Sequence, residues 1–140
     1  MNVERQIIGS LLLDSSRIDE MRLISSEMFT DAVLSKIFSL FEHSEGKEIN
    51  QLVIIPQITS DFLTEQQAVE LLAEIVSEHD SGISDRSCVN RLFDEYRVRK
   101  FNEILEHTKL SPANIESTLE EYKEQIDSLQ RHMRERKQEV

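Results

Sequence analysis

The chain has 140 residues and a formal net charge of −11, with three glycines and two prolines. So few turn-forming residues exclude a β-rich fold and predict an all-α protein. A chain this acidic repels a phosphate backbone, so we expect protein partners and no direct binding of nucleic acid. The single cysteine, Cys88, cannot form an internal disulfide, and no apolar run is long enough to span a membrane. The N-terminus lacks the pattern of a signal peptide, and we expect a cytoplasmic protein.

The first predicted element is a helix that is capped by Asn2 and runs to about Leu13. Gly9 interrupts it at a cost of about 1 kcal/mol relative to alanine, so we expect another backbone to approach closely at Gly9-Ser10. The segment Asp14-Ser15-Ser16 is expected to end this helix and to cap a short second one. The residues expected to face inward are Val3, Ile7, Ile8, Leu11, Leu12, Ile18, Met21 and Ile24.

Asp31 is expected to open a third helix that stops near His43 and supplies the densest part of the core. Pro56 is expected to break the next helix into a kink or two short helical turns, because proline lacks the N–H of the helix interior. Thr64 can cap the fifth helix, which is predicted to end at Glu78. The apolar residues of the third and fifth helices are Val33, Leu34, Ile37, Phe38, Phe41, Ala68, Val69, Leu71, Leu72, Ile75 and Val76.

The last part of the chain, 85–140, is predicted to form two long helices joined by a short turn at 110–114. Ser111 can cap the second of these helices, with Pro112 at its first position. Apolar residues cover a wide arc of the first helix, which indicates burial against two neighbours. In the second helix they alternate spacings of four and three, which is a heptad seam: Ile115, Leu119, Tyr122, Ile126, Leu129 and Met133.

One neighbour of the first long helix is the seam helix, and the other is either the body of the domain or a second copy of the chain. An ordinary hairpin that completes a monomeric bundle is the alternative that periodicity leaves open. The two apolar sides of the first helix are Val89, Leu92, Phe93, Tyr96 and Ile104, and Val98, Phe101 and Leu105.

The sequence offers no catalytic, cofactor or metal site. Its four histidines do not pair with one another or with Cys88 at metal-ligand spacing. No GxxxxGK[ST] phosphate-binding segment is present. The basic cluster of Arg131, Arg134, Arg136 and Lys137 is interpreted as a solvated helix end, where cations suit the helix dipole.

The opening Glu4 to Asp14, with its Gln-Ile-Ile-Gly-Ser-Leu-Leu-Leu-Asp run, resembles the N-terminal domain of DnaB-family replicative helicases. The resemblance implies a small globular helical head, 1–84, followed by a long antiparallel helical hairpin, 85–140. The stretch around Pro56 and the Leu63-Thr64-Glu65 segment depart from the family pattern, which suggests a divergent, phage or mobile-element member. The likeness continues through Ile18-Asp19-Glu20, Phe29-Thr30-Asp31, Glu45-Gly46-Lys47, Ser81-Gly82-Ile83-Ser84 and the helix that carries Tyr96, Arg97, Arg99 and Lys100.

In this family the hairpins pair into dimers, the dimers form the collar of a hexameric ring, and primase and helicase loaders act on the collar. The resemblance therefore implies a non-catalytic module of DNA replication that self-associates and docks primase or a loader. The residues expected at the hairpin interface are Tyr96, Val98, Phe101, Leu105, Ile115, Leu119, Tyr122, Ile126 and Leu129.

Family members continue into a RecA-like ATPase motor, and this sequence contains none of it. Two readings follow: the chain is the N-terminal part of an ATP-driven helicase, or it is a free-standing homologue that binds a host helicase, loader or primase. The helicase-binding domain of primase and a helical-bundle enzyme are further alternatives. The opening sequence fits the helicase better than primase, and no residue constellation supports an enzyme.

Overall fold

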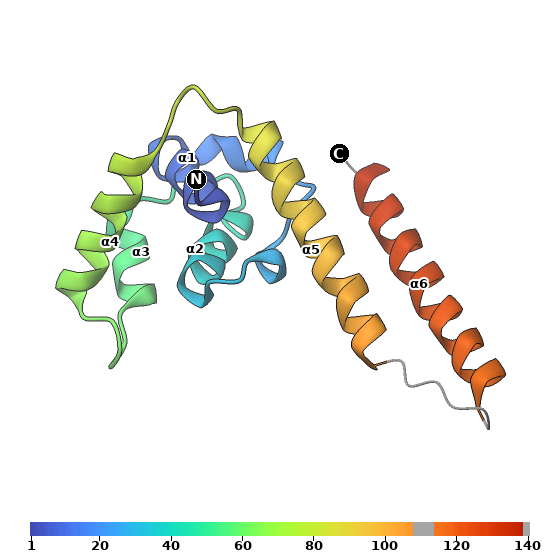
Figure 1. The fold of residues 1–140 in the computed structure, drawn as a ribbon. Coiled ribbons are helices and arrows are strands. Elements are labelled where there is room, and N and C mark those ends of the chain that lie inside the picture. The colour runs from blue at the N-terminus through green and yellow to red at the C-terminus, as the bar shows by residue number, and fades with distance from the viewer. Residues whose placement is uncertain (108–113, 139–140) are drawn as a thin grey trace. The chain divides into compact units, whose positions relative to one another are not determined.

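The computed structural model describes residues 1–107 and 114–138, which form helices and no strand. The predicted all-α fold is therefore confirmed. The chain divides into two compact units, Met1–Leu92 and Phe93–Val140, which we call the N-terminal unit and the C-terminal unit. The elements are α1 Val3–Leu13, the 3₁₀ helices η1 Ser15–Glu20 and η2 Ser26–Met28, α2 Ala32–Glu42, α3 Gln51–Ile58, α4 Glu65–Glu78, α5 Asp85–His107 and α6 Ile115–Gln138 (Figure 1).

Side-chain caps explain where three of these helices begin. The Asn2 side chain accepts a hydrogen bond from the Arg5 N–H at the start of α1. At the start of α2 the Asp31 carboxylate accepts two backbone N–H groups. In α4, Thr64 and Gln67 form a reciprocal capping box. The caps predicted at Asn2, Asp31 and Thr64 are confirmed, because a cap depends only on residues within one turn of it.

Of the two alternatives predicted at Pro56, two separate short turns are wrong, because α3 is a single helix with Pro56 inside it, and a kink stays a prediction. Asn50 caps this helix by accepting from the Leu52 N–H. The missing N–H of Pro56 deprives only the carbonyl four residues earlier, that of Leu52, and Leu52 is exposed in the first turn. The helix ends two residues after Pro56, so the loss of one interior hydrogen bond is tolerated.

The short second helix predicted after Asp14 is a 3₁₀ helix, η1, capped by Asp14. Met21 and Ile24 are buried as expected, but they lie beyond its end rather than on it. Ile18, within η1, is only half-buried. This segment reaches the core through irregular backbone, whose direction apolar periodicity does not predict.

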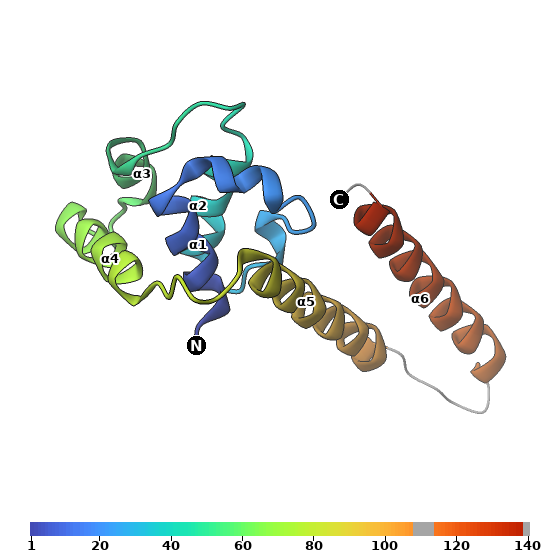
Figure 2. The same ribbon diagram turned by 90° about the horizontal axis from the view of Figure 1, so that it is seen from above.

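The core of the N-terminal unit lies between α1, α2 and α4, and α3 packs against α4 in both views (Figures 1 and 2). The rings of Phe29 and Phe38 stack with centroids 4.9 Å apart. Val69, one of the apolar residues of the predicted fifth helix, is exposed, because it lies on the side of α4 away from Ala68 and Leu72. The fully buried side chains of α1, α2 and α4 include Ile7, Ile8, Leu11, Ile37, Phe38, Phe41, Leu72 and Ile75.

Gly9 marks the close approach of α1 to the end of α4. A Cβ built on Gly9 would lie 3.2 Å from the His79 Cβ and 3.3 Å from the Ile75 carbonyl oxygen. The close backbone approach predicted for Gly9-Ser10 is confirmed. It explains why a residue of low helix propensity stands inside α1.

The first two turns of α5 belong to the N-terminal unit, with Cys88, Val89 and Leu92 buried. The predicted turn at 110–114 lies outside the described residues, except for Asn114, whose carbonyl accepts from the Thr118 N–H at the start of α6. The predicted capping by Ser111 and the placement of Pro112 also lie outside the described residues.

Candidate functional site

A buried polar network links α1 to the segment between α4 and α5. Ser10 is fully buried, and its hydroxyl donates to Asp85 Oδ1 at 2.6 Å. The same hydroxyl lies 2.8 Å from His79 Nε2, so that nitrogen donates to it. Serine, histidine and aspartate also form catalytic triads, in which the serine hydroxyl donates its proton to the imidazole. Here the serine hydroxyl donates to the carboxylate instead. The network therefore supports the fold rather than a nucleophile.

Gln6 reinforces this connection. Its side-chain amide donates to the Asp80 carbonyl at 2.7 Å and accepts from the Asp80 N–H at 3.1 Å. Both ends of a buried amide are thus satisfied, as burial requires. Sequence reasoning missed these roles, although two polar residues, Gln6 and Ser10, within the apolar opening of α1 were a signal for buried hydrogen bonds.

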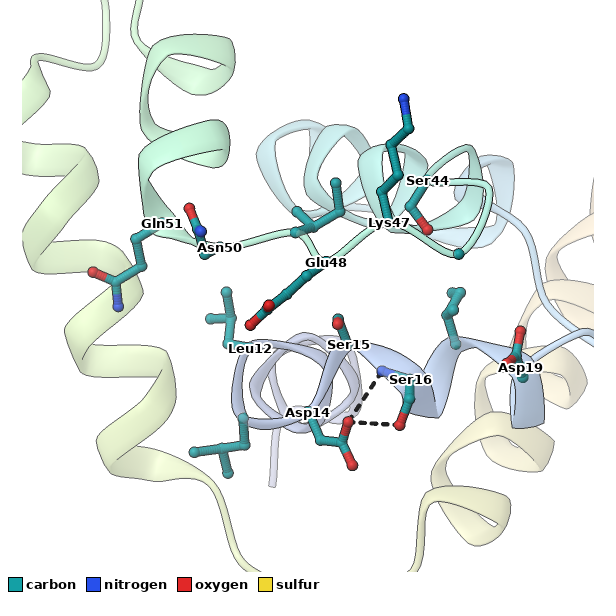
Figure 3. Close-up of a pocket in the computed structure, with 14 residues that line it drawn as sticks. Leu12, Asp14, Ser15, Ser16, Asp19, Ser44, Lys47, Glu48, Asn50 and Gln51 are labelled. Atoms are coloured by element: carbon teal, nitrogen blue, oxygen red, sulfur yellow. Dashed lines mark hydrogen bonds between the residues drawn. The ribbon is translucent and has the colours of Figure 1, made fainter.

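A surface pocket of about 600 Å³ lies between the end of α1, η1 and the α2–α3 loop (Figure 3). Asp14 Oδ1 accepts from the Ser16 hydroxyl and the Ser16 N–H, and these bonds hold the pKa of Asp14 below its usual value. The Glu48 side chain points toward Leu12, whereas Lys47 points away (Figure 3). The Asp14 carboxylate is already engaged as a cap, and the pocket presents no acid–base pair.

Cys88 is buried, and this burial is the main cause that raises the pKa of its thiol, followed by the charge of Asp85. A protonated buried thiol is a poor nucleophile. Within residues 1–107 and 114–138, no three side chains of the types that ligate metals come together. The helices in those ranges include none with the length and apolar character to cross a bilayer.

The C-terminal unit carries the predicted interface residues, and many of them are uncovered. Val98 and Leu105 of α5 are 59% and 53% exposed, and Ile115 and Leu119 of α6 are 44% and 45% exposed. The remaining five are half-buried: Tyr96, Phe101, Tyr122, Ile126 and Leu129.

The heptad seam of α6 is covered at one end only. Ile115 and Leu119 at its start are exposed, the middle is half-buried, and Met133 near its end is 5% exposed. Periodicity predicted the seam but gave no sign of this gradient. The first turns of α6 therefore present apolar side chains that the described residues leave exposed.

At the covered end of the seam, α5 and α6 share a pocket of about 340 Å³. It brings Phe101, a predicted interface residue, together with Met133 of α6. Arg134 and Lys137, interpreted from the sequence as part of a solvated helix end, are exposed as expected and also line this pocket, which the sequence analysis did not predict. Their helical spacing with Met133 was the available signal. The lining residues are Phe93, Arg97, Phe101, Gln130, Met133, Arg134 and Lys137.

The charges of the chain are segregated along the sequence. No lysine or arginine occurs from residue 48 to residue 85, a stretch that contains α3 and α4 and eight acidic residues. In α6, the first half, up to Asp127, has five acidic residues and one cation, Lys123, whereas Arg131 to Lys137 holds four cations and one carboxylate. Such segregation favours complementary contacts between proteins.

Comparison with known proteins identifies the fold. The sequence model of the DnaB-like helicase N terminal domain matches residues 1–94. The match covers more than half of the chain, which therefore belongs to this family of N-terminal helicase domains. No curated protein and no solved structure matches the chain.

Family membership gives the context of an oligomeric helicase, in which an N-terminal domain of this kind is by itself non-catalytic. The residues that the structure describes contain no nucleotide-binding fold. The matched residues end at Asp94, so the rest of α5 and all of α6 lie outside them. The role of the C-terminal unit therefore has to be argued from its own surface.

Proposed function

We propose that this domain is a non-catalytic collar module of a replicative DNA helicase. Its C-terminal units pair between copies of the chain, and the assembled domains dock primase or a helicase loader during DNA replication in the cytoplasm. The motor of the parent helicase would supply ATP hydrolysis. The observation that carries the proposal is the row of exposed apolar side chains on α5 and α6.

The α5 side chains form one stripe. Val98 and Leu105 are seven residues apart, which is two helical turns, and Phe101 lies between them on the same face. Single exposed apolar residues are ordinary on protein surfaces, but a contiguous stripe marks a protein contact. A second copy is the simplest partner, because the family context is an oligomeric helicase.

The N-terminal unit has its own exposed apolar residues. Phe62, between α3 and α4, is 96% exposed, and Leu52 of α3 is 83% exposed. Large exposed apolar side chains are typical of protein-binding surfaces and of anchor positions within them. These residues support docking of a second kind of protein on the N-terminal unit. The cation-free stretch from residue 48 to residue 85 argues against nucleic acid at this surface.

The test is the oligomeric mass of the 140-residue chain in light scattering. The unmodified protein is expected to exceed its monomer mass of 16.3 kDa, and the Val98→Asp/Leu105→Asp variant is expected to return to it. Both side chains are exposed, so the aspartates do not enter the core. The matched control is Leu52→Asp/Val69→Asp, which places the same charges on exposed apolar positions of the N-terminal unit and is expected to keep the higher mass.

Two results would overturn self-association through the C-terminal unit. One is an unmodified protein that stays at its monomer mass at high concentration. The other is a Val98→Asp/Leu105→Asp variant whose mass equals that of the unmodified oligomer.

A further inference from the structure

The pocket of about 340 Å³ between α5 and α6 lies within the C-terminal unit. Its lining residues on α5 are spaced i, i+4 and i+8, and those on α6 are spaced i, i+3, i+4 and i+7, so each helix contributes one face. The α5 face carries two phenyl rings and a guanidinium, and the α6 face carries an amide, a thioether and two cations. Among the described residues, no carboxylate lines the pocket. The lining therefore combines flat apolar surface with positive charge.

The positive charge continues beyond the pocket along both helices. Residues 97–100 hold three cations and no carboxylate, and residues 131–137 hold four cations and one carboxylate. The net charge of −11 is an average over the whole chain, whereas at physiological salt a ligand responds mainly to charges within about 8 Å. The overall acidity, from which we expected no binding of nucleic acid, therefore does not exclude a phosphate group at this pocket.

Two of the pocket cations are available to an anion. Arg134 and Lys137 are exposed and form no ion pair with a residue of the described ranges. Arg97 donates to Asp94 Oδ1 at 2.9 Å, and its buried Nε has no hydrogen-bond partner in those ranges. An anion that enters the pocket would meet Arg134 and Lys137 without displacing a carboxylate.

The two rings of the pocket differ in what they offer a ligand. Phe93 is 1% exposed, and the guanidinium carbon of Arg97 lies 5.6 Å from its ring centroid, so this ring is already covered. Phe101 is only half-buried. A flat ring beside cations is the combination on which proteins stack nucleobases and hold their phosphates. The exposed amide of Gln130 has both a donor and an acceptor, which suits the edge of a base.

An acidic peptide with an apolar side chain is the other ligand that would complement this lining. It would use the charge and the apolar surface, but it would give no role to the flat ring or to the amide. A base that carries phosphate uses the ring, the amide and the cations together. The observations therefore favour a nucleotide.

We propose that the pocket binds a nucleotide unit, with its base against Phe101 and Gln130 and its phosphate at Arg134 and Lys137. A volume of about 340 Å³ lies in the range of small-molecule sites. Such a unit occurs as a free nucleoside phosphate and within a single strand of nucleic acid, and the chemistry at the pocket is the same for both. The inference does not depend on the self-association proposed above.

Ligand titrations of the full 140-residue chain, followed by heteronuclear NMR, test the inference. Deoxyadenosine triphosphate is expected to bind with a dissociation constant below about 1 mM and to shift the signals of Gln130, Arg134 and Lys137. Deoxyadenosine lacks the phosphates and tripolyphosphate lacks the base, so each is expected to bind at least about fivefold more weakly. A single-stranded octamer of deoxyadenylate distinguishes the two sources. Tighter binding of the triphosphate identifies a free nucleotide, and tighter binding of the octamer identifies a strand.

Variants test which residues form the site. Arg134→Gln/Lys137→Gln is expected to raise the dissociation constant of deoxyadenosine triphosphate at least about tenfold, because both charge-assisted contacts are lost. The matched control is Lys123→Gln/Arg131→Gln, which removes the same charge from exposed positions of α6 outside the pocket and is expected to stay within about threefold. Phe101→Leu removes the ring and is expected to weaken the nucleotide at least about threefold but tripolyphosphate by less than about twofold. Circular dichroism confirms that each variant is folded.

Four results would overturn the inference. They are no saturable binding of the triphosphate or the octamer at millimolar concentration, a pocket variant that binds the triphosphate as tightly as its control, and tripolyphosphate binding as tightly as the nucleotide. The fourth is tighter binding of the acidic tripeptide Glu-Leu-Glu than of either nucleotide ligand, which would assign the pocket to a peptide. None of these results bears on self-association, which the mass of the Val98→Asp/Leu105→Asp variant decides.

Discussion

The two units of this protein differ in how completely they bury apolar side chains and in whether buried polar groups have hydrogen-bond partners. In the N-terminal unit, the core side chains of α1, α2 and α4 are almost fully buried, and the buried polar residues Gln6 and Ser10 have hydrogen-bond partners. In the C-terminal unit, Val98 and Leu119 are exposed, and the buried Arg97 Nε has no hydrogen-bond partner among the residues that the structure describes. The N-terminal unit thus has a closed core in addition to exposed apolar residues such as Phe62, whereas most described apolar side chains of the C-terminal unit are half-buried or exposed.

The difference follows from what each unit can bury. Helices in the N-terminal unit cross one another and enclose side chains on several sides, as α1 does between α2 and α4. The C-terminal unit consists of long helices, and a two-helix arrangement covers at most one face of each. The apolar side chains left exposed on the remaining faces are the basis of the self-association proposed above.

The largest expected effect compares two phenylalanines. Phe38→Ala is expected to lower the free energy of unfolding by about 3–5 kcal/mol, because it leaves a cavity in a closed core. Phe101→Ala is expected to lower it by about 1 kcal/mol in the monomer, since its ring is only half-buried. Urea unfolding at low protein concentration measures both values, and Phe62→Ala, at a 96% exposed ring, is the control with little change. Equal losses for Phe38 and Phe101 would break the comparison between the units.

A smaller effect is expected from Ser10→Ala. The variant removes the hydroxyl that donates to Asp85 and accepts from His79, so both lose a partner, at an expected cost of about 1–3 kcal/mol. Ser128→Ala, at an exposed position of α6, is the matched control with an expected change below about 0.5 kcal/mol. Thermal unfolding measures the two variants. If they unfold at the same temperature, the network does not stabilise the N-terminal unit.

The smallest effect concerns the surface of the N-terminal unit. The hydrogen bonds from Ser16 lower the pKa of Asp14 in the folded state, so the stability they contribute is present above the unfolded pKa and is lost as pH falls below about 4. Ser16→Ala removes the hydroxyl donor and is expected to raise the Asp14 pKa toward its ordinary value. Titration of the carboxyl carbon by NMR measures the pKa of Asp14. An unchanged value would mean that the backbone N–H alone accounts for the shift.

Much of the N-terminal unit could be predicted from the sequence, because its helix starts depend on local groups such as Asn2, Asp31 and Thr64. Gly9 was informative for the same reason, since a glycine inside an apolar helix indicates a close neighbour. Pro56 misled because its effect depends on which carbonyl loses its partner and on whether that carbonyl is exposed.

The candidate site was less predictable. Apolar spacing identified residues such as Val98 and Leu119 but not which of them the chain would cover. The Ser10–His79–Asp85 network joins residues that are more than sixty positions apart in sequence, and no local pattern pairs them. Arg134 and Lys137 are exposed, as predicted for a solvated helix end. The sequence did not show that they line a pocket with Phe101, because that depends on the packing of α5 near α6.

The absence of lysine and arginine from residue 48 to residue 85 also governs how the protein can be digested. Trypsin, which cleaves after lysine and arginine, has no site between Lys47 and Arg86. It releases α3, α4 and their loops as one peptide, however open that part of the chain becomes. The C-terminal unit has many trypsin sites. A tryptic map would therefore detect local unfolding of the C-terminal unit but not local unfolding of α3 and α4. A protease specific for glutamate would report on both units.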